Sequence, residues 1–247
     1  MITLGIDIGG SATKGALVDT ETGKMVSERI RYETETLVKP REVAALVEKI
    51  RKKLGYHGII GAGYPGVVKN GVAMTAANLH KNWIGTDVAA LIFNQTGQVT
   101  TVLNDADAAG LAEMRFGVEE ARQYKTVLFL TVGTGIGSAL FVDGHLIPNT
   151  ELGHLKIRGK DAEHRASDAV RQRENLSWKK WGKRFTEVLQ TYEFLFNPDL
   201  FILGGGISSK YESYAEYLKI NTKILPAKLE NTAGIIGAGM AAHEASA

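Results

Sequence analysis

The chain has 247 residues, of which 44% are hydrophobic and 23% charged, with a formal net charge of +2 and no cysteine. This composition is typical of a soluble, compact protein with one large domain or two closely joined domains. No apolar run approaches the roughly 18 residues needed to span a bilayer. The first residues lack the features of a signal peptide, so we expect a cytoplasmic protein with no membrane partner.

The missing cysteines and the small net charge exclude further classes of site and partner. Without cysteine the chain has no disulfides, thiol nucleophiles or thiolate zinc sites. A net charge of +2 gives no reason to expect nucleic acid as a partner. The 28 glycines fall in clusters, and these clusters carry most of the information.

In the first part of the chain, the pattern predicts a β-hairpin with a glycine turn. Residues 3–8 and 14–19 read as its two strands, joined by Gly9, Gly10 and Ser11. A third strand is expected over residues 25–32, followed by a helix that starts at Pro40. A buried strand over 57–63, a helix over 87–95 and a strand over 98–103 complete this part.

The second part of the chain repeats this plan. A helix is predicted over 106–116, then strands over 126–132 and 138–142 around a second glycine turn at 133–137. A buried strand at 200–203, a turn at 204–206 and a helix at 234–242 follow. We therefore expect two α/β lobes, residues 1–104 and 105–247, with the last helix packing back on the first lobe.

Both glycine turns are suited to phosphate, because glycine lets backbone amides approach a ligand closely. Neither turn has the P-loop or the dinucleotide-binding pattern, and both could be ordinary hairpin turns. Asp7 precedes the first turn, where a carboxylate could hold Mg²⁺ through water or could cap the turn. Lys14 could neutralise a phosphate or lie exposed on its strand.

Two polar groups are candidates for the chemistry. Asn104 and Asp105 lie where an apolar strand meets a helix, the place where α/β sheets bind ligands. A carboxylate there could take the proton from a hydroxyl that accepts a phosphoryl group, or could only cap the helix. Glu151, His154 and Glu163 form a cluster suited to sugar hydroxyls, although His154 could also be a buried structural histidine.

Residues 156–184 are strongly basic. They contain ten lysines and arginines and four acidic residues, a formal charge of +6. Such a segment fits a polyanionic partner, or it forms a solvated helical face.

Five motifs, in order, resemble the bacterial ROK sugar kinases of the actin, hexokinase and Hsp70 superfamily. They are DIGGSATKGALVD, NDADAAGLAE, LTVGTGIGSALFVDG, ELGH and LGGGIS. Residues 148–181 are more narrowly similar to the branch that phosphorylates glucose with inorganic polyphosphate. The resemblance implies a two-lobed α/β fold of the actin/hexokinase/Hsp70 type (ribonuclease H-like), with an active-site cleft between the lobes.

The resemblance also implies the reaction and the residues that perform it. Phosphoryl transfer from polyphosphate, with ATP as an additional donor, to the 6-hydroxyl of glucose would give glucose 6-phosphate, with Mg²⁺ as cofactor and Asp105 as general base. The residues implied to bind glucose are Asn78, Asn104, Asp105, Glu151, His154 and Glu163. Those implied to bind the phosphoryl donor are Asp7, Gly9, Gly10, Ser11, Thr13, Lys14, Thr134, Gly135, Ile136, Gly137, Gly205 and Gly206.

One departure from the family pattern concerns zinc. Typical members carry a cysteine-rich zinc motif after the ELGH histidine, whereas this chain has no cysteine, so no zinc is expected. ROK proteins are commonly dimers, which makes a homodimer the expected assembly. The alternatives are a strictly ATP-dependent ROK hexokinase acting on glucose or mannose, and a non-catalytic sugar-binding protein.

Overall fold

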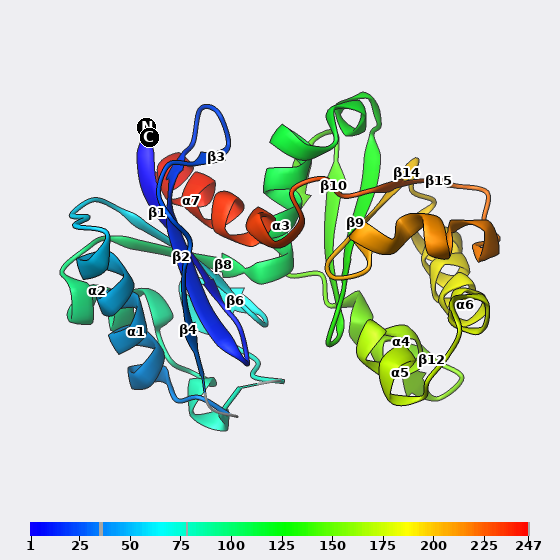
Figure 1. The fold of residues 1–247 in the computed structure, drawn as a ribbon, viewed down its shortest axis with the longest axis horizontal. Coiled ribbons are helices and arrows are strands. Elements are labelled where there is room, and N and C mark those ends of the chain that lie inside the picture. The colour runs from blue at the N-terminus through cyan, green and yellow to red at the C-terminus, as the bar shows by residue number, and fades with distance from the viewer. Residues whose placement is uncertain (35–36, 78, 247) are drawn as a thin grey trace. The chain divides into compact units, whose positions relative to one another are not determined.

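The computed structural model describes residues 1–34, 37–77 and 79–246. Packing separates the chain into two compact units, shown as ribbons in Figure 1. The first unit comprises Met1–Ala112 and Thr232–Ala247, and the second comprises Glu113–Asn231. The lobe boundaries expected from the sequence stay a prediction.

The first unit is built on a mixed sheet. Its main strands are β1 (Ile2–Ile8), β2 (Ala12–Asp19), β5 (Ile60–Tyr64) and β8 (Thr100–Asn104). The order is β3-β2-β1-β5-β8, with β3 at Lys24–Met25, and β4 (Ile30–Glu33) also pairs with β2. β1 and β2 form the predicted antiparallel hairpin, while β5 runs parallel to β1 and β8 parallel to β5.

The prediction of a single strand over residues 25–32 is wrong. The chain forms two short strands instead, β3 (Lys24–Met25) and β4 (Ile30–Glu33). Between them, the Ser27 hydroxyl accepts the Leu17 backbone N–H at 2.9 Å. The Leu17 N–H is thus bonded to a side chain and not to a backbone carbonyl of a continuous third strand. The backbone pairing with β2 is therefore interrupted at Ser27.

Helices cover both faces of this sheet (Figure 1). α1 (Pro40–Lys53) and α2 (Val88–Thr96) lie on one face, and α3 (Asp105–Ala112) and α7 (Ala233–Ser246) on the other. Gly61 permits the close approach of α7, since a Cβ there would lie 1.7 Å from the Ala238 carbonyl oxygen. The strands β6 (Val68–Lys69) and β7 (Val72–Ala73) form a separate small hairpin.

Local signals explain where these helices begin and end. Pro40 occupies the first turn of α1, as predicted. The Asp87 carboxylate accepts the Ala90 N–H at the start of α2, and Gly97, with φ 72°, ends that helix. The helix predicted over 106–116 is α3 followed by a wider, π-type turn at Glu113–Gly117.

The second unit repeats the plan of the first. β9 (Thr126–Val132) and β10 (Ile136–Val142) form the second predicted hairpin, and β14 (Leu200–Gly204) and β15 (Lys223–Pro226) continue the sheet in parallel. The order β11-β10-β9-β14-β15 matches β3-β2-β1-β5-β8 strand for strand, with β11 at His145–Ile147. The common plan predicted from the two hairpins is therefore confirmed.

One face of this second sheet is covered by the core around α6 (Trp178–Phe196). Buried Trp181, Phe185 and Leu189 pack in one cluster with Leu128 and Leu130 of β9. Two shorter helices, α4 (Ala162–Ala166) and α5 (Asp168–Arg173), precede α6, and a small ribbon of β12 (Lys156–Ile157) and β13 (Lys160–Asp161) precedes them. Single helical turns occur at Glu119–Gln123, Leu152–His154, Ser208–Ser213, Ala215–Tyr217 and Glu230–Thr232.

No helix in the described ranges is both long and apolar enough to cross a membrane.

Candidate active site

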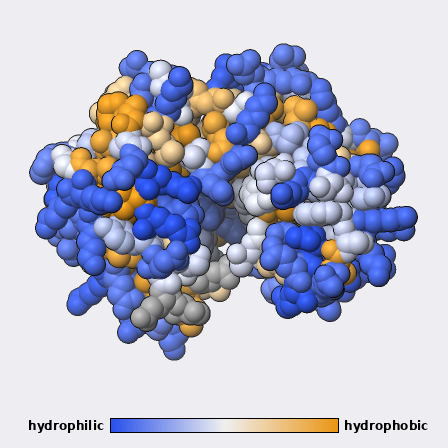
Figure 2. Space-filling model, viewed as in Figure 1, coloured by the Kyte–Doolittle hydropathy of each residue, from blue (hydrophilic) through white to orange (hydrophobic). Residues whose placement is uncertain are grey.

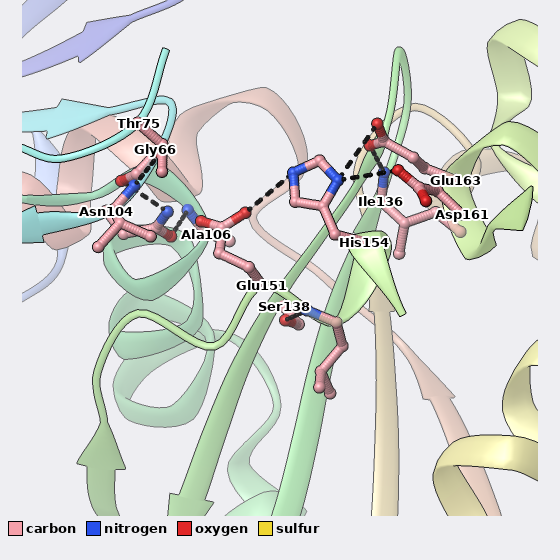
Figure 3. Close-up of polar contacts among 12 residues, drawn as sticks. Gly66, Thr75, Asn104, Ala106, Ile136, Ser138, Glu151, His154, Asp161 and Glu163 are labelled. Atoms are coloured by element: carbon pink, nitrogen blue, oxygen red, sulfur yellow. Dashed lines mark hydrogen bonds and ion pairs between the residues drawn. The ribbon is translucent and has the colours of Figure 1, made fainter. Parts of the chain in front are cut away.

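Asn104 and Asp105 lie at the junction of β8 and α3. The Asn104 side-chain oxygen accepts the N–H groups of Ala106 and Asp107 at 2.8 and 3.0 Å, and its amide donates to the Gly66 carbonyl at 3.1 Å (Figure 3). The Asp105 carboxylate also accepts the Ala106 N–H, at 2.7 Å. The expected helix cap is thus present, and it fixes both side chains at the carboxyl end of a sheet strand.

The first glycine turn is held by backbone bonds. The Gly9 N–H donates to the Ala12 carbonyl at 3.0 Å. The carbonyls of Gly10 and Ser11 both accept hydrogen bonds from Thr34, from its hydroxyl and its N–H respectively. With these carbonyls engaged elsewhere, the turn keeps the compact shape that a phosphate-binding loop needs.

Asp7 and Lys14 form an ion pair beside this turn. They are cross-strand partners in the β1–β2 hairpin, and the Lys14 Nζ lies 2.8 Å from the Asp7 Oδ2. Asp7 offers a hard oxygen that suits Mg²⁺, and its side chain is 21% exposed. Since Asp7 would be a single carboxylate ligand, water and phosphate oxygens would have to complete the coordination of Mg²⁺ there.

The second glycine turn is joined directly to a predicted sugar-binding residue. The Ile136 N–H donates to the Glu163 Oε2 at 3.3 Å. Gly135 leaves room for this carboxylate, because a Cβ at Gly135 would lie 2.3 Å from the same oxygen. Gly153 packs closely against the same turn, since a Cβ at Gly153 would lie 2.1 Å from the Ile136 carbonyl oxygen.

Glu151 and His154 lie on the segment that follows β11. Buried Ser138 holds this segment, since its hydroxyl donates to the Thr150 carbonyl and accepts the Leu152 N–H at 3.1 Å. The Tyr192 hydroxyl donates to the Leu152 carbonyl at 2.7 Å. The loop is thereby fixed from both β10 and α6, although its sequence has no regular pattern.

The predicted cluster of Glu151, His154 and Glu163 is present within the second unit (Figure 3). The His154 Nε2 lies 3.7 Å from the Glu151 Oε2, and its Nδ1 lies 3.9 Å from the Glu163 Oε1. Burial raises the pKa of the Glu151 carboxyl; His154 opposes this rise and Glu163 adds to it. The His154 side chain is 45% exposed, so it is not the buried structural histidine that was the alternative.

Asp161 is a member of this cluster that the sequence did not reveal. Its Oδ2 lies 3.4 Å from the His154 Nδ1, and its other oxygen is ion-paired with Lys156. His154, Asp161 and Glu163 bring ligand atoms within 4.8 Å of one another, as a metal site would require. The set fits a metal ion poorly, because Lys156 and the Ile136 N–H already supply positive partners to the two carboxylates.

The remaining predicted residues are distributed as follows. The turn of Gly204, Gly205 and Gly206 directly follows β14, and Gly205, with φ 77°, packs against the backbone of Val132 in β9. Asn78 lies outside the described residues. Within the first unit, the structure brings together Asn104 with Asp105, and Asp7 with the Gly9–Lys14 turn; the other set lies in the second unit.

The chain belongs to the ROK family, whose family model matches residues 3–167. It is 48% identical to a polyphosphate glucokinase of Mycobacterium tuberculosis (strain CDC 1551 / Oshkosh) over 96% of this chain and 89% of that protein. A polyphosphate glucokinase of Mycobacterium leprae is 46% identical over 96% of this chain and 73% of its own length.

A solved structure extends the likeness to three dimensions. The inorganic polyphosphate/ATP-glucomannokinase of Arthrobacter sp. strain KM matches with a TM-score of 0.94 and 43% identity over 99% of both chains. These findings confirm the resemblance to ROK sugar kinases and the expected α/β fold of the actin and hexokinase type.

Proposed function

We propose that this protein phosphorylates glucose at its 6-hydroxyl with inorganic polyphosphate, giving glucose 6-phosphate, and that ATP is a second donor. The observation that carries this proposal is the 46–48% identity to polyphosphate glucokinases over 96% of the chain. The Arthrobacter relative, whose name includes both donors, supports the dual donor use. Mannose is a second candidate acceptor, because that relative is a glucomannokinase.

In this proposal Asp105 is the general base. Phosphoryl transfer to an alcohol requires orientation of the hydroxyl, removal of its proton and stabilisation of charge on the transferred group. The cap at the start of α3 holds the Asp105 carboxylate in one direction. Asn104, Glu151, His154 and Glu163 would bind the sugar hydroxyls, each of which can donate and accept a hydrogen bond.

The donor residues would act through backbone amides and charge. The turns at 9–11 and 134–137 would receive phosphate oxygens, and Lys14 would contribute a positive charge. Thr13, Gly205 and Gly206 belong to the same proposal. When bound, Mg²⁺ would neutralise phosphate oxygens, with Asp7 holding it through water.

The basic segment supports a polyanionic donor. Among the described residues, five of its ten basic side chains have no ion pair: Lys160, Arg173, Lys179, Lys180 and Lys183. All five are exposed. Figure 2 shows a mostly hydrophilic surface over α4 and α5. Unpaired, exposed cations attract a polyphosphate chain without recognising its ends.

The first test compares donors directly. Formation of glucose 6-phosphate is measured in a coupled assay with glucose and Mg²⁺, using long-chain polyphosphate or ATP at equal phosphoryl concentration and ionic strength. We expect activity with polyphosphate. Activity with ATP alone would favour the ATP-dependent hexokinase, and glucose binding without any product would favour a sugar-binding protein.

The second test addresses the base. Asp105→Asn should lower kcat by about 10²-fold or more while leaving folding and glucose affinity nearly unchanged. Asp87→Asn is the matched control, because Asp87 also accepts a backbone N–H at a helix start of the same unit. Near-normal turnover of Asp105→Asn would remove Asp105 from the mechanism.

The basic segment is tested by reversing charge. The triple variant Lys179→Glu, Lys180→Glu and Lys183→Glu should raise the KM for polyphosphate and flatten its salt dependence. The KM for ATP serves as the internal control. Equal changes in the KM for polyphosphate and for ATP would show that this segment is a solvated helical face and not a polyphosphate-binding surface.

The expected assembly follows from the resemblance to the ROK family, and the expected location follows from the sequence. A homodimer and a cytoplasmic location remain predictions, which size-exclusion chromatography with light scattering and cell fractionation would test.

A further inference from the structure

The His154 ring meets carboxylates on both of its nitrogens. The Nδ1 lies 3.4 Å from the Asp161 Oδ2 and 3.9 Å from the Glu163 Oε1, while the Nε2 lies 3.7 Å from the Glu151 Oε2. Of these three oxygens, the Asp161 oxygen alone is within hydrogen-bonding distance. Because the partner of one ring nitrogen sets the proton on the other, Asp161 is the residue that can fix the tautomer of His154.

The β12–β13 ribbon brings Asp161 to this position. Lys156 and Asp161 are cross-strand partners in the ribbon, and their side chains are ion-paired. Arg158 and Gly159 form its two-residue turn with φ values of 49° and 77°, the pattern of a type I′ turn. This tight turn folds Asp161 back beside His154, seven positions earlier in the chain.

The charge of Asp161 determines whether it donates a hydrogen bond to the His154 ring or accepts one from it. The ion-paired Lys156 lowers the pKa of the Asp161 carboxyl, although burial opposes this change. Its side chain is only 14% exposed. An ionised carboxylate is solely an acceptor, so the ring nitrogen that faces it must carry a proton.

We infer that Asp161 is a positioning residue of the sugar site. It accepts the Nδ1–H of His154 and thereby leaves the Nε2 of the neutral ring as an acceptor for a sugar hydroxyl. Lys156 balances the charge of Asp161 through their ion pair. This inference rests on the proposed function in one respect, namely that His154 binds the sugar.

The tautomer can be measured without any substrate. Nitrogen-15 NMR of the histidine rings, with His154 assigned by its absence in His154→Gln, should show the neutral ring protonated on Nδ1. Asp161→Asn should change this signature, whereas Lys156→Gln should keep it because Asp161 remains. A wild-type neutral ring protonated on Nε2 would overturn the inference, as would an identical change in both variants.

The second measurement is glucose binding and turnover. Asp161→Asn should weaken glucose binding and raise its KM by about tenfold, about the value of one hydrogen bond, with kcat changed by less than about threefold. Asp168→Asn is the matched control: Asp168 is similarly buried, at 16% exposure, and pairs with Arg171. Asp168→Asn should leave the KM for glucose unchanged.

The two failures are distinguishable. If Asp161→Asn lowers kcat and leaves the KM unchanged, or if Asp168→Asn has the same effect on the KM, Asp161 does not position a sugar ligand. If the wild-type protein neither binds nor phosphorylates glucose, the proposed function fails. The NMR result still decides in that case whether Asp161 sets the tautomer.

Discussion

Substitution of Gly135 by alanine should separate sugar binding from folding. The new methyl carbon would lie 2.3 Å from the Glu163 Oε2, whereas ordinary contacts begin near 3.4 Å. The Glu163 carboxylate must therefore move by about 1 Å. It is the end of a flexible side chain, so the backbone of the turn can remain in place.

The magnitudes follow from what that movement breaks. The Ile136 N–H loses its bond to Glu163, and such bonds to charged groups contribute about 1.5–3 kcal/mol. At 3.3 Å the bond is long, which places its contribution at the lower end. Alanine also restricts the unfolded chain, a gain of about 0.4–1 kcal/mol. The net loss of stability should be about 1 kcal/mol.

Glucose affinity should fall more clearly than stability. If Glu163 accepts a sugar hydroxyl, displacing it should weaken glucose binding about tenfold. Isothermal titration calorimetry measures the affinity, and urea unfolding measures the stability. Gly133→Ala is the control, because a Cβ at Gly133 would meet no described atom within 4 Å beyond its chain neighbours, and the backbone there is not left-handed.

A double variant makes this reasoning refutable. Gly135→Ala and Glu163→Gln act through the same carboxylate, so their effects on glucose affinity should be strongly non-additive. Wild-type affinity in Gly135→Ala would show that the position of Glu163 does not matter for the sugar. Fully additive losses would show that the two residues act separately.

Two further predictions concern stability. Gly153→Ala should destabilise the protein by about 2–3 kcal/mol in urea unfolding, because its Cβ would lie 2.1 Å from the backbone oxygen of Ile136; unchanged stability would contradict the close packing of this turn. Glu48→Gln should cost about 1.5 kcal/mol at pH 7. Arg51 lowers the folded-state pKa of Glu48 below 4.5, so this stabilisation is complete above the unfolded pKa and is lost as pH falls through the folded value. If the difference in unfolding free energy between wild type and Glu48→Gln stayed constant as the pH fell, the Glu48–Arg51 ion pair would not be the source of this stability.

Much of the fold could be predicted from local sequence. Alternation of apolar residues and the glycine turns predicted both hairpins, and the cap residues Asn104 and Asp105 predicted the start of α3. These features depend on neighbours within a few residues, which is why periodicity and capping chemistry reveal them. The Asn104–Asp105 pair was found in this way, since a strand end followed by a cap is a local pattern.

Contacts between distant segments were decided only by the tertiary structure. Nothing near Glu163 in the sequence indicates that its carboxylate accepts the N–H of Ile136, or that Gly135 is needed to make room for it. The interruption between β3 and β4 likewise depends on Ser27 reaching Leu17 across the sheet.

Asp161 is the clearest example of the difference between what local sequence predicts and what tertiary structure decides. The Arg158–Gly159 pair is a readable turn signal, but the sequence does not say which residue the turn returns to. The register of the β12–β13 ribbon places Asp161 opposite Lys156, and the fixed loop around His154 places the ring beside it. Local chemistry determined the elements of this protein, whereas long-range packing determined which side chains meet, because each such meeting depends on the path of both segments.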